Sequence, residues 1–183
     1  MKVAIIGSGI VGLTLAHTLT ENNIEVTIFE KEKDSLSHGT GRNSGVIHSG
    51  IYYQPNTLRS NLCIKGAKLM KKFIVDNNLY INNCGKLLLP KTKNDIETLK
   101  LLYERSKEVG VEAQKLNSIE EIIRIEPNCN PLYNDALFIK DTAIADPKEV
   151  SNKLIEILKK RNVIIKYGFK VDEISSENTS ITT

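Results

Sequence analysis

Short apolar runs alternate with segments of helical periodicity in the amino-terminal part of the chain. Residues 3–6 form a continuous apolar run, which is typical of a buried strand in a parallel sheet. Apolar residues then recur at helical spacing over residues 10–19, and a second predicted strand, residues 25–30, has β-branched or apolar residues at 26–29. This order of strand, helix and strand predicts a βαβ unit with a right-handed crossover.

Periodicity and capping patterns predict further elements in the rest of the chain. Ser118 lies three residues before Glu121, as in a capping box, and Asp146 precedes Pro147, as at a helix start. From residue 169 the sequence leads into a last hairpin. The predicted helices begin near residues 58, 94, 118 and 147, and the predicted strands span residues 84–90, 137–144 and 163–166.

Composition and charge exclude several classes of protein. The chain has 183 residues, of which 40% are hydrophobic and 26% charged, an ordinary globular composition. Its net charge is +3, and basic residues are interspersed with acidic ones, so a nucleic-acid-binding stripe is not expected. We expect no secretory signal and no transmembrane segment, because no apolar run approaches about 20 residues. Three widely spaced cysteines favour reduced thiols in the cytoplasm over a disulfide framework or a metal site.

Residues 7–12 fit the pattern G-x-G-x-x-G between the first predicted strand and helix. Its glycines permit a tight turn, close approach of the backbone to a pyrophosphate, and close packing of helix on strand. The helix then presents unpaired N–H groups to the phosphates. Glu30 ends the second strand, where a carboxylate accepts hydrogen bonds from an adenosine ribose and disfavours a 2′-phosphate. The motif leaves FAD and NAD open. The candidate cofactor-binding residues are Gly7, Gly9, Ile10, Val11, Gly12, Glu30 and Lys31.

Residues 39–53 form a long segment that is rich in glycine, serine and asparagine. Loops of this length are uncommon in compact domains and tend to be functional. Small residues would let the backbone approach a flat, bulky ligand, although glycine, serine and asparagine are also routine in surface turns. Arg42 could instead bind a substrate carboxylate. The polar side chains of this segment include Arg42, Asn43, Ser44 and His48.

In residues 41–53, Gly-Arg-Asn-Ser-Gly-Val-Ile-His-Ser-Gly-Ile-Tyr-Tyr, the chain resembles the L-2-hydroxyglutarate oxidase and dehydrogenase family, which belongs to the D-amino-acid-oxidase-like flavoproteins. The similarity continues through Leu62-Cys63, Gly66-Ala67, residues 84–87, Glu126-Pro127 and residues 142–146. The chain departs from the family at residues 142–146, which read Thr-Ala-Ile-Ala-Asp in place of the usual Thr-Gly-Ile-Val-Asp. Pro147 stands where the family commonly has tyrosine.

The resemblance implies an FAD-dependent enzyme that oxidises a 2-hydroxy acid to a 2-oxo acid by hydride transfer to the flavin. His48 is the expected catalytic residue, because the reaction needs a base for the hydroxyl proton and imidazole titrates in the useful range. Gly41, Arg42, Asn43 and Ser44 are expected to contact FAD, and Val171 to place its backbone against the adenine. The electron acceptor would be oxygen or a quinone. We expect a cytoplasmic enzyme, peripheral at the membrane if it is linked to a quinone.

We therefore expect an α/β fold in which a Rossmann-like FAD-binding domain with a parallel sheet is interrupted by part of an α+β substrate domain. The FAD-binding domain would comprise residues 1–82 and 146–183, and the inserted substrate-domain segment residues 83–145. Family members are longer than this chain. The sheet is accordingly expected to be incomplete at the C-terminus, and a separate chain could supply the remaining half.

Three other interpretations stay open. A flavoprotein of the same superfamily that acts on an amino acid or a glycerol phosphate would share this architecture, and activity tests on candidate substrates would separate it. A non-catalytic, truncated nucleotide-binding fragment would be recognised from the DNA that follows codon 183. An NAD-dependent dehydrogenase would lack the flavin absorption at roughly 450 nm.

Overall fold

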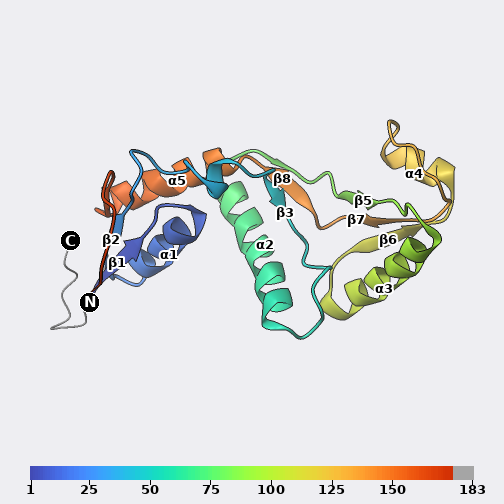
Figure 1. Ribbon diagram of the computed structural model, residues 1–183, viewed down its shortest axis with the longest axis horizontal. Coiled ribbons are helices and arrows are strands. Elements are labelled where there is room, and N and C mark those ends of the chain that lie inside the picture. The colour runs from blue at the N-terminus through green and yellow to red at the C-terminus, as the bar shows by residue number, and fades with distance from the viewer. Residues whose placement is uncertain (175–183) are drawn as a thin grey trace. The chain divides into compact units, whose positions relative to one another are not determined.

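The computed structural model describes residues 1–174, and its contacts divide the chain into two units (Figure 1). The first unit contains residues 1–44 and the chain from Asp146 onward, and the second contains residues 45–145. The division at Asp146 coincides with an expected domain boundary. The other division differs from the sequence-based expectation, which placed residues 45–82 with the first domain. Their strands pair with strands of the inserted segment, which explains the difference.

The first unit is built on a parallel sheet, as the sequence predicted, and its strand order is β1-β2-β9. Val3 lies beside Val26, Ile5 beside Ile28, and Ile28 in turn beside Ile165. The helix α1 joins β1 to β2 and packs against α5, which precedes β9 (Figure 1). These elements are β1 (Lys2–Ile6), α1 (Ile10–Glu21), β2 (Glu25–Phe29), α5 (Pro147–Lys160) and β9 (Ile164–Lys166).

The predicted start of α5 is confirmed in atomic detail. The carboxylate of Asp146 accepts a hydrogen bond of 2.8 Å from the amide of Lys148, and Pro147 occupies the first helical position. At the other end of the helix, the guanidinium of Arg161 donates to the carbonyl oxygen of His17 at 3.1 Å, which ties α5 to α1. Val150, Leu154 and Leu158 form the buried stripe of the helix.

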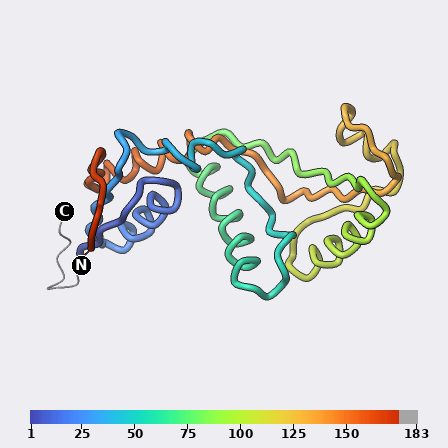
Figure 2. Tube along the Cα trace, viewed as in Figure 1, coloured from blue at the N-terminus to red at the C-terminus, as the bar shows by residue number. Residues whose placement is uncertain are grey.

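The second unit contains two antiparallel sheets with the strand orders β3-β8-β4 and β5-β7-β6. The strand predicted over residues 137–144 is in fact two strands, because a turn at residues 140–141 separates β7 from β8, which belong to different sheets. Figure 2 traces the path of the chain through this unit. The strand predicted over residues 84–90 is shorter, since Gly85 has a φ of 71°. The strands are β3 (Val46–Ile47), β4 (Ile81–Asn82), β5 (Lys86–Leu88), β6 (Ala113–Leu116), β7 (Ala136–Ile139) and β8 (Ala143–Ala145); the helices are α2 (Leu58–Asp76), α3 (Lys93–Val109) and α4 (Ile119–Ile125).

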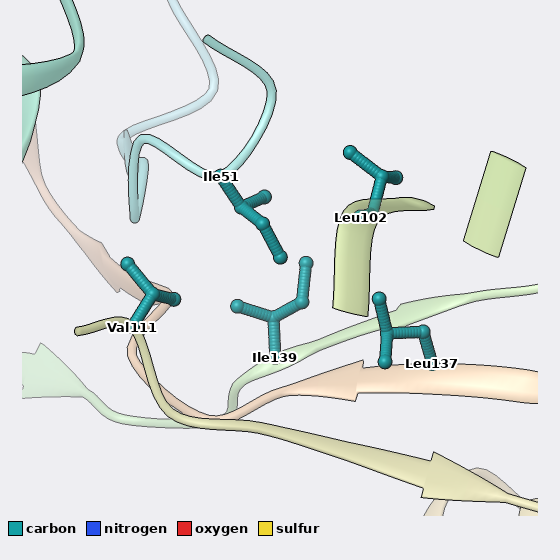
Figure 3. Packing of buried hydrophobic residues seen from close by; sticks show 5 residues of the cluster. All are labelled: Ile51, Leu102, Val111, Leu137 and Ile139. Carbon is teal, nitrogen blue, oxygen red and sulfur yellow. The ribbon is translucent and has the colours of Figure 1, made fainter. Parts of the chain in front are cut away.

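A cluster of buried aliphatic residues forms the core of the second unit. Figure 3 shows side chains that converge from a loop, from α3 and from β7. Each buried aliphatic side chain of this size contributes roughly 1.5–3 kcal/mol relative to an exposed one. The cluster consists of Ile51, Leu102, Val111, Leu137 and Ile139.

The helix α2 exposes the side on which its leucines recur and buries the side that carries Ile74. Leu58, Leu62 and Leu69 recur at helical spacing, yet all three are exposed to solvent. The exposed fraction is 73% for Leu58 and 58% for each of the other two. The buried residues of this helix are Ser60 and Ile74, which lie on the other side. Periodicity determines which residues share a face, but contacts with the rest of the fold decide which face is covered.

Two local predictions need correction. At the start of α4, Ser118 accepts a hydrogen bond from the amide of Glu121, but the carboxylate of Glu121 accepts from Asn117, so the reciprocal box is not closed. A reciprocal capping box instead begins α3, between Thr92 and Asp95. The last hairpin is not formed over residues 169–174, which contain no strand, and its remainder lies outside the described residues. Among residues 1–174, no helix is both long and apolar enough to cross a membrane.

Candidate functional site

The glycine loop between β1 and α1 has a backbone that side chains would disrupt. Gly7 has a φ of 99°, a left-handed conformation that favours glycine, and its amide donates to the carbonyl oxygen of Phe29 at 2.8 Å. A Cβ atom on Gly12 would collide with the carbonyl oxygen of Gly7 and lie 3.3 Å from Cγ2 of Ile5. The first and third glycines of the motif are therefore required by the turn and by the packing of α1 on β1.

The amino terminus of α1 points its first amide at a hydroxyl group from a distant turn. Gly9 is the N-cap of α1 and offers no side chain, so the amide of Ile10 donates to Oγ1 of Thr40 at 3.0 Å. A Cβ atom on Gly9 would lie 3.1 Å from the same oxygen. Thr40 belongs to the short 3-10 helix η1 (Gly39–Gly41), and sequence reasoning passed over it. An oxygen acceptor thus occupies the position where a phosphate oxygen binds in dinucleotide sites.

Glu30 follows β2 and directs its carboxylate at the glycine loop. Its Oε2 accepts hydrogen bonds of 2.8 Å from the amide and from the hydroxyl of Ser8, and its Oε1 accepts one of 3.0 Å from the amide of Glu32. Burial favours a higher pKa for Glu30, but these hydrogen bonds outweigh it and lower the pKa below the ordinary value. The carboxylate is therefore ionised. About four acceptor positions are available on a carboxylate, so it can take a further hydroxyl donor.

Two residues that the sequence did not indicate support Ser8. The hydroxyl of Ser35 donates to Oγ of Ser8 at 2.7 Å, and it lies 3.0 Å from the hydroxyl of Tyr167. Backbone amides of the segment after β9 donate to the carbonyl oxygens of Glu30 and Glu32, both at 2.8 Å. Tyr167 is 132 residues away from Ser35 in the chain, so no local pattern could have revealed the contact.

The other expected cofactor-binding residues differ in their surroundings. Lys31 is exposed, and its ammonium lies 3.8 Å from the carboxylate of Glu32. The side-chain amide of Asn43 donates to the carbonyl oxygens of Gly39 and Thr40, so it supports the turn that carries Thr40. Arg42 and Ser44 are exposed, Val11 is 77% exposed, and Val171 is half-buried beyond β9.

His48, the expected catalytic residue, lies in the second unit, directly after β3. It is exposed. Its carbonyl oxygen is 3.7 Å from Sγ of Cys63, and burial raises the pKa of that thiol, which is therefore protonated near neutral pH. The glycine loop and Glu30 belong to the first unit.

The geometry of the first unit suits the ADP half of a dinucleotide. The loop permits close approach of the backbone, the amino terminus of α1 favours negative charge, and the ionised Glu30 accepts hydrogen bonds from hydroxyl groups. The three cysteines are free thiols, and residues 1–174 contain no group of three or more histidine, cysteine or acidic residues that could hold a metal ion.

Comparison with known sequences gives a consistent picture. The family described as DAO, FAD dependent oxidoreductase, matches residues 2–183. The mitochondrial L-2-hydroxyglutarate dehydrogenase of Dictyostelium discoideum is 43% identical over 152 residues, which are 81% of this chain and 34% of that protein. The mitochondrial L-2-hydroxyglutarate dehydrogenase of Homo sapiens is 35% identical over 182 residues, 97% of this chain and 39% of that protein.

Solved structures share the fold. The L-alpha-glycerophosphate oxidase of Mycoplasma pneumoniae with FAD bound superposes with a TM-score of 0.83 at 27% identity, covering 97% of this chain and 47% of that one. The L-proline dehydrogenase of P. horikoshii has a TM-score of 0.86 at 24% identity, covering 97% of this chain and 46% of that one, a likeness of fold alone. The chain thus spans less than half the length of these relatives.

Proposed function

Because the chain belongs to the DAO family of FAD-dependent oxidoreductases, we propose that its first unit binds the ADP half of FAD and that it serves the oxidation of a 2-hydroxy acid. The substrate class is that of L-2-hydroxyglutarate, which is converted to the 2-oxo acid. One observation carries the cofactor proposal: the ionised Glu30 is hydrogen-bonded to Ser8 inside the glycine loop, beside the amino terminus of α1.

Each part of this loop has a definite task in the proposal. The glycines admit the pyrophosphate to the backbone, the amides of α1 that follow Ile10 bind its oxygens, and Glu30 accepts hydrogen bonds from the ribose. Asn43 donates a hydrogen bond to the carbonyl oxygen of Thr40, and the hydroxyl oxygen of Thr40 accepts from the amide of Ile10 at the same helix end. When bound, FAD supplies the acceptor for two electrons. The proposed binding residues are Gly7, Gly9, Ile10, Val11, Gly12, Glu30, Lys31, Thr40, Gly41, Arg42, Asn43, Ser44 and Val171.

Nucleotide titration of the purified chain tests the cofactor proposal. We expect FAD and ADP to compete for one site, and bound FAD to be seen by its absorption at roughly 450 nm. Glu30→Gln should weaken ADP binding by about tenfold, since the negative charge and one of the two acceptor oxygens are lost. Glu25→Gln is the matched control, because the carboxylate of Glu25 lies at the start of β2, 3.4 Å from the ammonium of the exposed Lys2. Preference for NAD, or equal affinity of the Glu30 variant and the wild type, would contradict the proposal.

His48 is the proposed catalytic base, which accepts the proton of the substrate hydroxyl through its imidazole. The support is its place in the segment that resembles the family, together with its exposed side chain. In a full-length relative, we expect the enzyme in which the equivalent histidine is replaced by alanine to retain FAD and to lose turnover. Turnover that is unchanged would remove His48 from this role.

The substrate is proposed from the names of the sequence relatives, which are L-2-hydroxyglutarate dehydrogenases at 43% and 35% identity. A glycerol phosphate is the second candidate, because the Mycoplasma pneumoniae oxidase shares the fold at 27% identity. Comparative turnover of L-2-hydroxyglutarate and glycerol 3-phosphate separates the two. We further propose oxygen or a quinone as electron acceptor, and a cytoplasmic location, at the membrane surface if a quinone is used; several relatives are mitochondrial.

A further inference from the structure

Three hydroxyl groups of the first unit form a continuous series of hydrogen bonds that ends at Glu30. We call Ser8, Ser35 and Tyr167 the hydroxyl network; they follow β1, β2 and β9 respectively. The hydroxyl of Ser8 lies 2.8 Å from the carboxylate of Glu30 and 2.7 Å from the hydroxyl of Ser35. The hydroxyl of Ser35 lies 3.0 Å from that of Tyr167. The network thus joins the carboxyl ends of three parallel strands, the edge at which such sheets bind ligands.

The hydrogen bonds of the network all run toward Glu30. An ionised carboxylate only accepts hydrogen bonds, so the single hydroxyl hydrogen of Ser8 is donated to Glu30. Ser8 accepts from Ser35, whose own hydrogen is used in that bond. The hydrogen of the third bond therefore comes from Tyr167, which donates to Ser35. Hydrogen bonds in such a series polarise one another, so Tyr167 strengthens the bond between Ser8 and Glu30.

Backbone hydrogen bonds fix Tyr167 from both sides. The amide of Glu30 donates to the carbonyl oxygen of Lys166 at 2.9 Å, and the amide of Gly168 donates to the carbonyl oxygen of Glu32 at 2.8 Å. Gly168 has a φ of 66°, a left-handed conformation that favours glycine. The phenol of Tyr167 is therefore carried by a segment that is bonded to the residues on either side of Lys31.

The network also decides which oxygen of Glu30 can accept a further hydrogen bond. Oε2 accepts from the amide and from the hydroxyl of Ser8, whereas Oε1 accepts only from the amide of Glu32 among residues 1–174. A carboxylate has about four acceptor positions, two on each oxygen, so one position on Oε1 is left. Ser8 and Ser35 are buried, and water therefore does not compete for the hydroxyl groups that occupy Oε2.

We propose that Ser35 and Tyr167 are positioning residues of the ribose site, which act through Ser8. They keep Oε2 of Glu30 occupied, so Oε1 is the accepting oxygen, and it accepts a single ribose hydroxyl. Neither residue needs to touch the nucleotide in this role. The inference rests on the proposed binding of ADP and deepens it, because it states which oxygen binds the ribose and what holds that oxygen in place.

Three nucleotides that differ only in the ribose test the inference. ADP, 2′-deoxy-ADP and 3′-deoxy-ADP are titrated by calorimetry into the purified chain. In the wild type, one deoxy form should bind about tenfold more weakly than ADP, because it lacks the accepted hydroxyl, and the other should stay within about threefold. Tyr167→Phe and Ser35→Ala should each weaken ADP binding by about three- to fivefold. Both should leave the weaker deoxy form within about twofold of its wild-type affinity.

Matched controls remove the same atoms outside the hydroxyl network. Tyr80→Phe removes a phenol oxygen from a residue of the second unit that is 64% exposed, and Ser37→Ala removes a hydroxyl that donates to Asp34. Both variants should bind all three nucleotides as the wild type does. Equal weakening of all three nucleotides by Tyr167→Phe would indicate a packing role and overturn the inference, as would an unchanged affinity for ADP. A wild type that does not bind ADP would overturn the cofactor proposal and the inference with it.

A measurement without nucleotide separates the inference from the cofactor proposal. NMR titration of an isotope-labelled carboxyl group reports the pKa of Glu30, which burial raises and hydrogen bonds lower more strongly. The midpoint should move to higher pH in Ser35→Ala and in Tyr167→Phe, because each change weakens the bond that Ser8 donates. The shift should be larger in Ser35→Ala, which lies nearer to Glu30 in the network. His38, whose charge also lowers this pKa, is unchanged in both variants. Midpoints equal to that of the wild type would overturn the inference even where ADP binds.

Discussion

The candidate site of the first unit and the core of the second unit depend on different kinds of interaction. In the first unit, the candidate site depends on backbone groups and small polar side chains: Gly7, Gly12, and Glu30 hydrogen-bonded to Ser8. In the second unit, the core depends on bulky aliphatic side chains such as Leu137 and Ile139, which are fully buried. A backbone requirement restricts a position to glycine, whereas a packing requirement accepts several apolar residues. The first unit can therefore be recognised from its glycine motif. In the second unit, the periodicity of apolar residues indicates only where helices and strands lie.

The largest loss of stability is expected from a substitution at Gly12, in the glycine loop of the first unit. Gly12→Val places a Cβ atom against the carbonyl oxygen of Gly7, which is backbone and cannot move aside cheaply. We expect a loss of roughly 4–5 kcal/mol in the free energy of unfolding, measured by urea denaturation, and no ADP binding. The control is Gly66→Ala in α2, where a Cβ meets nothing within 4 Å; it should raise stability by about 0.5–1 kcal/mol. A stable Gly12→Val protein that binds ADP would show that the backbone of the loop does not require glycine at this position.

A somewhat smaller effect is expected in the core of the second unit. Leu137→Ala leaves a cavity beside Ile139 and Leu102, and should cost about 2–4 kcal/mol in the free energy of unfolding. Leu101→Ala in α3 removes the same atoms from a residue that is 57% exposed, and should cost less than about 0.5 kcal/mol. The folded Leu137→Ala protein should bind ADP as the wild type does. A weakened ADP affinity would show that the candidate site depends on the core of the second unit.

The smallest effect should appear as a dependence of stability on pH. Hydrogen bonds lower the pKa of Glu30 in the folded protein, so its carboxylate stabilises the fold fully above the ordinary pKa of 4.5. That contribution is lost as the pH falls through the lowered value. In Glu30→Gln this part of the acid dependence should be absent, and stability at neutral pH should be about 1–2 kcal/mol lower. Urea denaturation of both proteins across this pH range measures the difference. Parallel pH profiles would show that Glu30 is not held by these hydrogen bonds.

Local signals in the sequence were sufficient for several structural features. The βαβ unit, the glycine loop and the helix start at Asp146 each depend on residues within one or two elements, and all three are present. The parallel pairing of β9 with β2 also agrees with the strand predicted over residues 163–166. These features are encoded by short-range patterns of apolar residues, caps and glycines, which remain readable without knowledge of the partners.

The sequence by itself determined the βαβ unit at the amino terminus, the turn that needs glycine, and the carboxylate at the end of the second strand. Only the tertiary structure decided that Thr40 meets the amide of Ile10, that Ser35 and Tyr167 support Ser8, and that α2 buries Ile74 while its leucines are exposed. The physical reason is the separation along the chain between the residues that interact. A turn or a cap is stabilised by neighbours in the chain, whereas these contacts join residues that only the packing of distant elements brings together.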